Sequence, residues 1–93
     1  MEQLLFADFE GREGDTFALD GVGSPNELRL EEVSLLGVSH RDGGSFRLIF
    51  RGSGEAVLPQ AIYSLRDGDT CHDMFLVPIG RDAAGCQYEA IFN

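Results

Sequence analysis

The residues best suited to catalysis lie in one short stretch, residues 68–75, which reads GDTCHDMF. It places a thiol, an imidazole and a carboxylate in a row, at Cys71, His72 and Asp73. A cysteine nucleophile needs its base within hydrogen-bond reach and aimed at the same point. Successive side chains of an extended segment point to opposite faces, so His72 would face away from both neighbours. If this segment is a strand, we expect no triad here and interpret Cys71 as a small, half-buried structural residue.

A second arrangement stays open, because Cys71 can meet His40 from another strand. The protein would then be a small ligand-binding or hydrolytic β-barrel. Its reactive groups would be Cys71, His72 and Asp73, or His40, with Asp69 as a further carboxylate. This alternative predicts a concave pocket that gathers these groups and shifts their pKa values.

The spacing of possible ligands disfavours a metal site. An EF-hand loop would need an Asp or Asn where Cys71 stands and a Gly where His72 stands. Zinc needs three or four converging ligands, and the Cys and His residues show neither C-x-x-C nor H-x-x-x-H spacing. A phosphate-binding glycine loop and a G-x-S-x-G motif are also missing. We predict no metal and no cofactor, and interpret Asp67 and Asp69 as solvated turn residues.

Length and charge restrict the class of protein and its partners. A chain of 93 residues corresponds to one domain. The net charge of −9 comes from 16 acidic and 7 basic residues, and every basic residue is arginine. Nucleic acids and anionic membranes would be repelled, so the acidity favours either a basic protein partner or simply a soluble surface. With no apolar run of about 18 residues and no cationic leader, we expect a cytoplasmic protein.

The hydrophobic pattern predicts the fold class. Twelve glycines divide the chain into short apolar runs separated by turns. Runs such as FRLIFR and CQYEAIFN alternate apolar and polar residues, which is the pattern of half-buried strands. The sequence therefore predicts a single all-β domain over residues 1–93, a small antiparallel barrel or sandwich of six to seven strands.

Two segments are ambiguous between helix and strand. Ser24 begins a good helix-start signal, but Leu28 and Leu30 alternate with charged residues. We predict a strand over residues 27–36 on the strength of this alternation. Residues 3–9 are compatible with a short N-terminal helix.

The run MFLVPI, residues 74–79, is apolar at every position. It predicts a strand that is covered on both faces or lies in the middle of a sheet. Pro78 cannot donate to a strand ladder, so it should fall at a strand end, an edge or a bulge. The predicted core consists of Phe17, Leu19, Leu28, Leu30, Val33, Phe46, Leu48, Phe50, Ile62, Leu65, Phe75, Val77, Tyr88, Ala90 and Phe92.

Cys71 and Cys86 are expected to be free thiols. If residues 73–79 and 86–92 form a hairpin, Cys86 pairs near Ile79. Cys71 then lies roughly 20 Å or more further along the first strand, at about 3.3 Å per residue. A disulfide requires Cα atoms within about 7 Å of each other.

Four residues are candidates for binding a partner: Gln60, Tyr63, Arg47 and Arg51. Gln60 can donate and accept hydrogen bonds, so it either fixes the backbone of a loop or contacts a partner together with Tyr63. The arginines either line an anion- or protein-binding surface or belong to a mixed-charge outer face. In the second case each ion pair contributes roughly a few tenths of a kcal/mol.

Four segments in this order, FRLIFRG, LPQAIYSL, MFLVPIG and YEAIFN, resemble a family of small bacterial domains of unknown function. FLVPIG and YEAIFN are the most specific parts, and the resemblance covers about residues 45–93. It implies an accessory part of a phage-tail-like assembly and supplies no catalytic residues. An apolar strand face that another subunit can cover leads to the same class. We therefore expect a non-enzymatic structural or protein-interaction module whose partners are proteins, a second copy of the chain included.

Overall fold

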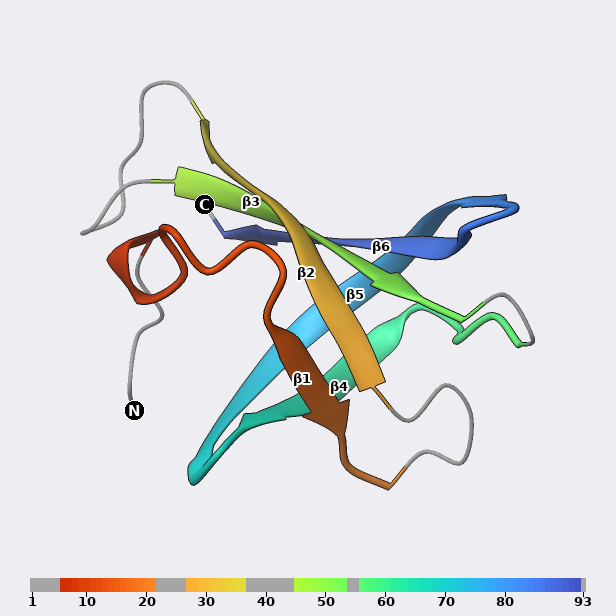
Figure 1. The fold of residues 1–93 in the computed structure, drawn as a ribbon, viewed down its shortest axis with the longest axis horizontal. Coiled ribbons are helices and arrows are strands. Elements are labelled where there is room, and N and C mark those ends of the chain that lie inside the picture. Colours follow the sequence, from red (N-terminus) through yellow and green to blue (C-terminus); the bar gives the residue numbers. More distant parts are fainter. Residues whose placement is uncertain (1–5, 22–26, 37–44, 54–55, 93) are drawn as a thin grey trace.

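The structure, a computed structural model, describes residues 6–21, 27–36, 45–53 and 56–92. The elements are the 3-10 helix η1 (Phe6–Asp8) and the strands β1 (Thr16–Leu19), β2 (Glu27–Leu36), β3 (Ser45–Gly52), β4 (Ala61–Asp67), β5 (Thr70–Asp82) and β6 (Gly85–Phe92) (Figure 1). The all-β antiparallel fold class is confirmed. The strand over residues 27–36 and a helical turn within residues 3–9 are confirmed as well.

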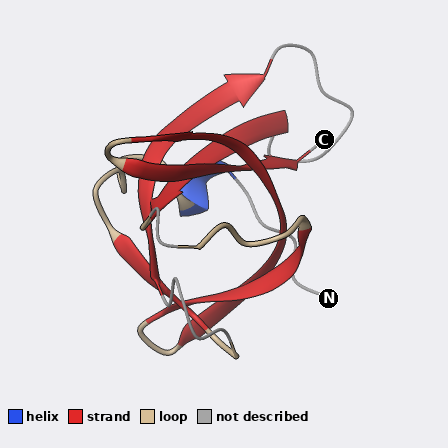
Figure 2. Cartoon of the chain, turned by 90° about the vertical axis from the view of Figure 1, so that its right-hand side faces the viewer, coloured by secondary structure: helices blue, strands red, loops and turns tan. Residues whose placement is uncertain are grey.

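The strands form one antiparallel sheet that closes on itself in the order β1-β2-β3-β6-β5-β4. Closure follows because β1 pairs with both β2 and β4. The spatial order β4-β1-β2-β3 is a Greek key, in which the connection after β3 returns the chain to lie beside β1. Figure 2 shows the strands surrounding a common interior.

Strand β5 is the longest and changes partner along its length. Residues 70–76 pair with β4, and residues 77–82 pair with β6. The register with β6 shifts between Pro78 and Gly80, which confirms that Pro78 lies at a bulge. A bulge bends the strand at the stretch where β5 changes from one partner to the other.

The hairpin of β5 and β6 is tighter than predicted. Cys86 pairs with Arg81 rather than near Ile79, because Ala83 and Ala84 alone form the turn. Both cysteines are free, as predicted.

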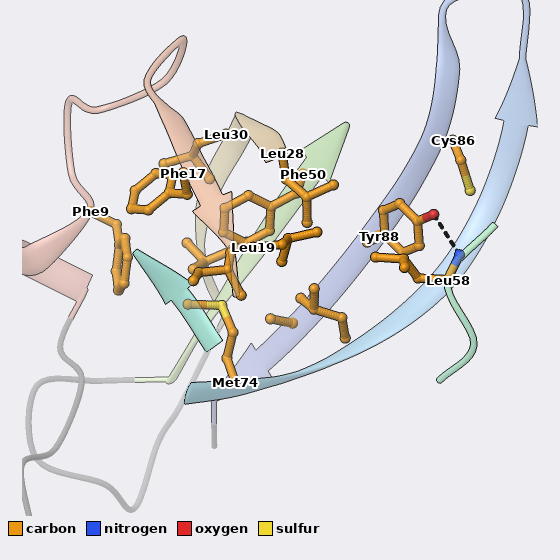
Figure 3. Close-up of a cluster of buried hydrophobic side chains, with 14 of the residues drawn as sticks. Phe9, Phe17, Leu19, Leu28, Leu30, Phe50, Leu58, Met74, Cys86 and Tyr88 are labelled. Atoms are coloured by element: carbon orange, nitrogen blue, oxygen red, sulfur yellow. Dashed lines mark hydrogen bonds between the residues drawn. The ribbon is translucent and has the colours of Figure 1, made fainter. Parts of the chain in front are cut away.

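The interior is filled by apolar side chains. The buried cluster consists of Phe9, Phe17, Leu19, Leu28, Leu30, Phe46, Leu48, Phe50, Leu58, Leu65, Met74, Leu76, Cys86, Tyr88 and Ala90, with Val33 and Phe92 packed against it. Figure 3 shows part of this cluster, from Phe9 to Tyr88. The prediction that Ile62 and Phe75 are core residues is wrong, since Ile62 is 71% exposed and Phe75 is 47% exposed. Met74 and Leu76 take the inward positions of β5. The outer face of this strand is therefore not covered by the part of the chain that the structure describes, and Val77 is half-buried.

The segment around η1 closes one end of the barrel. Phe9 is fully buried, and its ring lies 6.3 Å from Phe17 and 6.1 Å from Phe46. The ring of Phe6 lies 6.2 Å from that of Phe46. The main-chain N–H of Gly14 donates to Leu30, so this segment also attaches to β2.

Tyr88 ties the connection between β3 and β4 to the core. Its buried hydroxyl accepts a hydrogen bond from the main-chain N–H of Leu58 at 2.9 Å (Figure 3). Burial raises the pKa of the Tyr88 hydroxyl. A buried N–H without a partner is costly, so this bond lets the loop bury Leu58 as well.

Candidate functional site

The start of β5 keeps Cys71, His72 and Asp73 apart. Cys71 and Asp73 are exposed, and Asp73 accepts a hydrogen bond from the Ser64 hydroxyl at 2.5 Å. His72 is half-buried, and its ring lies 5.5 Å from the ring of buried Phe9. His72 thus faces away from its two neighbours, as alternation predicted. Cys71 is exposed rather than half-buried.

The remaining reactive groups do not assemble into a site within the described residues. His40 lies outside them, so its pairing with Cys71 stays a prediction. In the described ranges, no group of three or more His, Cys, Asp or Glu side chains is placed to hold a metal ion. Asp67 binds Arg12 at 2.5 Å, and Asp69 is exposed in the turn between β4 and β5.

Arg51 lies in a charged cluster on the outer face of β2, β3 and β6. Its guanidinium donates to Glu31 at 2.6 Å and to Asp82 at 2.8 Å. Gln87 donates to the same Glu31 at 2.6 Å. The bonds from Arg51 and then Gln87 lower the pKa of Glu31. The pKa of Asp82 is lowered by the main-chain N–H of Ala84 and then by Arg51.

Arg47 forms the second half of this charged face. It reaches Glu32 at 2.9 Å and Glu89 at 3.5 Å, which are the two cross-strand neighbours of Ile49. Ile49 is only 3% exposed on this outer face. Arg47 and Arg51 lie two positions before and two positions after Ile49 on β3. Long charged side chains cover apolar surface with their stems while the heads stay in water. The arrangement favours a mixed-charge face, and binding of a partner by either arginine stays a prediction.

Gln60 and Tyr63 lie near the start of β4. Gln60 is exposed, and its side chain makes no hydrogen bond to another described residue. Tyr63 is half-buried, and its hydroxyl donates to the Pro59 carbonyl at 2.5 Å. Burial raises the pKa of Tyr63. Within the described chain, Tyr63 and Tyr88 thus tie the loop that we expected Gln60 to fix, and partner contact by Gln60 and Tyr63 stays a prediction.

An apolar strip crosses the outer face of β4, β5 and β6. We define it as Ile62, Phe75, Val77 and Ile91. Ile62 and Phe75 are direct cross-strand partners, and such pairs have Cβ atoms about 5 Å apart. Val77 pairs with Glu89, and Ile91, 46% exposed, lies two positions further along β6 on the same face. The strip departs from the rule that outward strand positions are polar.

The comparison with known sequences identifies the family. The sequence matches the family described as domain of unknown function (DUF6916) over residues 4–92. The chain belongs to this family. No curated protein and no solved structure shows significant similarity to the chain. Among the residues that the structure describes, no helix is long and apolar enough to span a membrane.

The match to DUF6916 includes η1 and all six described strands. The feature of this DUF6916 domain that sequence reasoning missed is the outward position of Ile62 and Phe75. A signal was present, because a run that is apolar at every position must place some of its side chains outward if one face is solvated. The run alone does not say which side chains these are.

Proposed function

We propose that this DUF6916 domain is a non-enzymatic structural or protein-interaction module that binds a protein through the apolar strip. One observation carries the proposal: Ile62 and Phe75 oppose each other across β4 and β5 and are both exposed. Contiguous exposed apolar surface marks interaction sites in soluble proteins.

The energetics support this assignment. Fully burying a large apolar side chain is worth about 1.5–3 kcal/mol relative to leaving it exposed. Ile62 and Phe75 together therefore offer a partner several kcal/mol of contact energy, on a surface that the sheet already holds rigid. The interior formed by the described residues is occupied by their own apolar side chains.

The finer part of the proposal is an accessory role in a phage-tail-like assembly of a bacterial cell, with the domain in the cytoplasm. The resemblance of FRLIFRG, LPQAIYSL, MFLVPIG and YEAIFN to bacterial domains of unknown function supports it. The net charge of −9 is consistent with a protein partner rather than nucleic acid or an anionic membrane.

The test is a pull-down from the native host with matched baits. Wild type, Phe75→Ser and Leu35→Ser are compared; Leu35 is 63% exposed on β2, away from the strip. We expect a protein that wild type and Leu35→Ser retain and Phe75→Ser loses. A capture that does not change with Phe75→Ser would overturn the assignment to the strip.

A further inference from the structure

The apolar strip continues into a carboxylate on the same face. Next to the pair of Ile62 and Phe75, the following outward pair on β4 and β5 is Ser64 and Asp73. The only hydrogen bond of the Asp73 side chain within the described chain comes from the Ser64 hydroxyl. A ligand on this face would therefore meet an aromatic ring and a carboxylate two positions apart on one strand.

The same part of β5 has a ladder partner on one side only among the described residues. Residues 70–76 pair with β4 only, because pairing with β6 begins at Val77. A strand edge presents unpaired N–H and C=O groups to which an extended segment of another chain can add. Phe75 and Asp73 would then be the outward neighbours of the added segment.

Charge decides what kind of segment fits. The arginine side chains of the described chain are largely committed to its own carboxylates: Arg12 to Asp15 and Asp67, Arg29 to Glu31, Arg47 to Glu32 and Glu89, Arg51 to Glu31 and Asp82, and Arg66 to Asp20. Other carboxylates have no such partner among the described residues: Glu10, Glu13, Glu27 and Asp69. The uncompensated surface charge is therefore negative, and a second copy of the chain is repelled.

We infer that residues 70–76 of β5 and the apolar strip bind an extended, basic segment of a partner protein. This inference rests on the proposed function and names the chemistry of the partner. Lysine or arginine on the outward side of the added strand pairs with Asp73 and lies over the ring of Phe75, a cation–π contact. Main-chain hydrogen bonds to β5 supply sequence-independent affinity.

The probe is a short synthetic peptide of alternating lysine and valine, titrated into the isotope-labelled protein and followed by amide NMR. We expect shifts concentrated in residues 70–76 and in β4, and a dissociation constant that rises about tenfold or more between about 0.05 and 0.5 M salt. A glutamate–valine peptide and a lysine–serine peptide are the matched controls, and both should bind at least about tenfold more weakly.

Variants separate the strip from the general acidity of the surface. Phe75→Ser and Asp73→Asn should each weaken the lysine–valine peptide about fivefold to tenfold. Leu35→Ser should leave its affinity unchanged. Phe75 and Asp73 are both exposed, so the variants are expected to fold, and circular dichroism checks this.

Three results would overturn the inference. They are equal binding of the glutamate–valine peptide, shifts that do not involve β5, and affinity that Phe75→Ser leaves unchanged. A dimer in light scattering that Phe75→Ser dissociates would assign the strip to a second copy instead. If the peptide experiment fails but the pull-down still captures a host protein that Phe75→Ser loses, the proposed function stands. Failure of the inference and failure of the proposed function can therefore be told apart.

Discussion

The close approach of Gly85, the first residue of β6, to Gly52 of β3 provides the sharpest test of this fold. Its φ of +125° is one that side-chain-bearing residues rarely adopt. A Cβ at this position would lie 2.1 Å from the carbonyl oxygen of Gly52 and 3.2 Å from its carbonyl carbon. Gly52 lies in the ladder with β6, opposite Cys86, so it cannot move aside without breaking the pairing.

We therefore predict that Gly85→Ala is severely destabilising. The unfavourable φ costs about 1–3 kcal/mol, and relief of a clash with a constrained backbone costs about 1–3 kcal/mol more. The sum, about 4 kcal/mol, is a large fraction of the roughly 5–14 kcal/mol typical for a domain of this size.

Gly68 provides the matched control. It has a φ of +62°, but a Cβ there would meet nothing within 4 Å. Gly68→Ala should cost only the conformational part, about 1–2 kcal/mol. Urea unfolding followed by far-ultraviolet circular dichroism measures both. Equal losses of unfolding free energy for the two variants would show that the contact between Gly85 and Gly52 adds no cost to an alanine at position 85, and the reasoning would be refuted.

Three further predictions follow from named contacts. Tyr88→Phe should lower the free energy of unfolding by about 1–3 kcal/mol, because it leaves the Leu58 N–H buried without a partner. Since the pKa of Tyr88 is raised, its protonated form stabilises the fold below about pH 10, and this contribution is lost as the pH rises further. Tyr88→Phe should therefore reduce the loss of unfolding free energy at alkaline pH, measured by urea titration. The lowered pKa of Glu31 gives a contribution that is present above about pH 4.3 and lost as the pH falls through the folded-state pKa. Glu31→Gln should reduce the loss of unfolding free energy at acid pH. Deletion of residues 88–93 removes most of the β3–β6 ladder together with Tyr88, so the product should lack a cooperative thermal transition in circular dichroism; an unchanged melting curve would contradict this.

Much of this fold is readable from alternation alone. In β3, polar Arg47 and Arg51 mark the outward side, so Phe46 and Phe50 could be assigned to the core, where they are fully buried. The strand from residue 27 was predictable for the same reason. A polar residue at every second position fixes which face of a strand is wet, and it overrides a local helix-start signal.

The same reasoning fails where that mark is missing. In MFLVPI both sets of alternating positions are apolar, so nothing local distinguishes Met74 and Leu76 from Phe75 and Val77. Register with β4 decides the question, and it turns Ile62 outward together with Phe75. A one-residue shift exchanges the two faces of a strand, which is why this part of the core was assigned incorrectly and the strip was missed.

Contacts between distant residues were also beyond the sequence. Arg51 and Glu31 are 20 residues apart, and Leu58 and Tyr88 are 30 residues apart. Neither pair has a spacing that local structure would bring together, since both depend on which strands become neighbours when the sheet closes. The sequence therefore predicted that arginines lie outside and that Tyr88 lies inside, but not what either one binds.

Closure of the sheet also explains why a binding surface should lie where the apolar strip does. A closed barrel of this size fills its interior with side chains and protects most strand edges by pairing them. Near its bulge, β5 changes its pairing partner from β4 to β6, so residues 70–76 keep one edge unpaired among the described strands. The outward apolar pair of Ile62 and Phe75 lies in this same region. An unpaired edge and an exposed apolar face are each liabilities for a soluble protein, and a single bound segment would cover both.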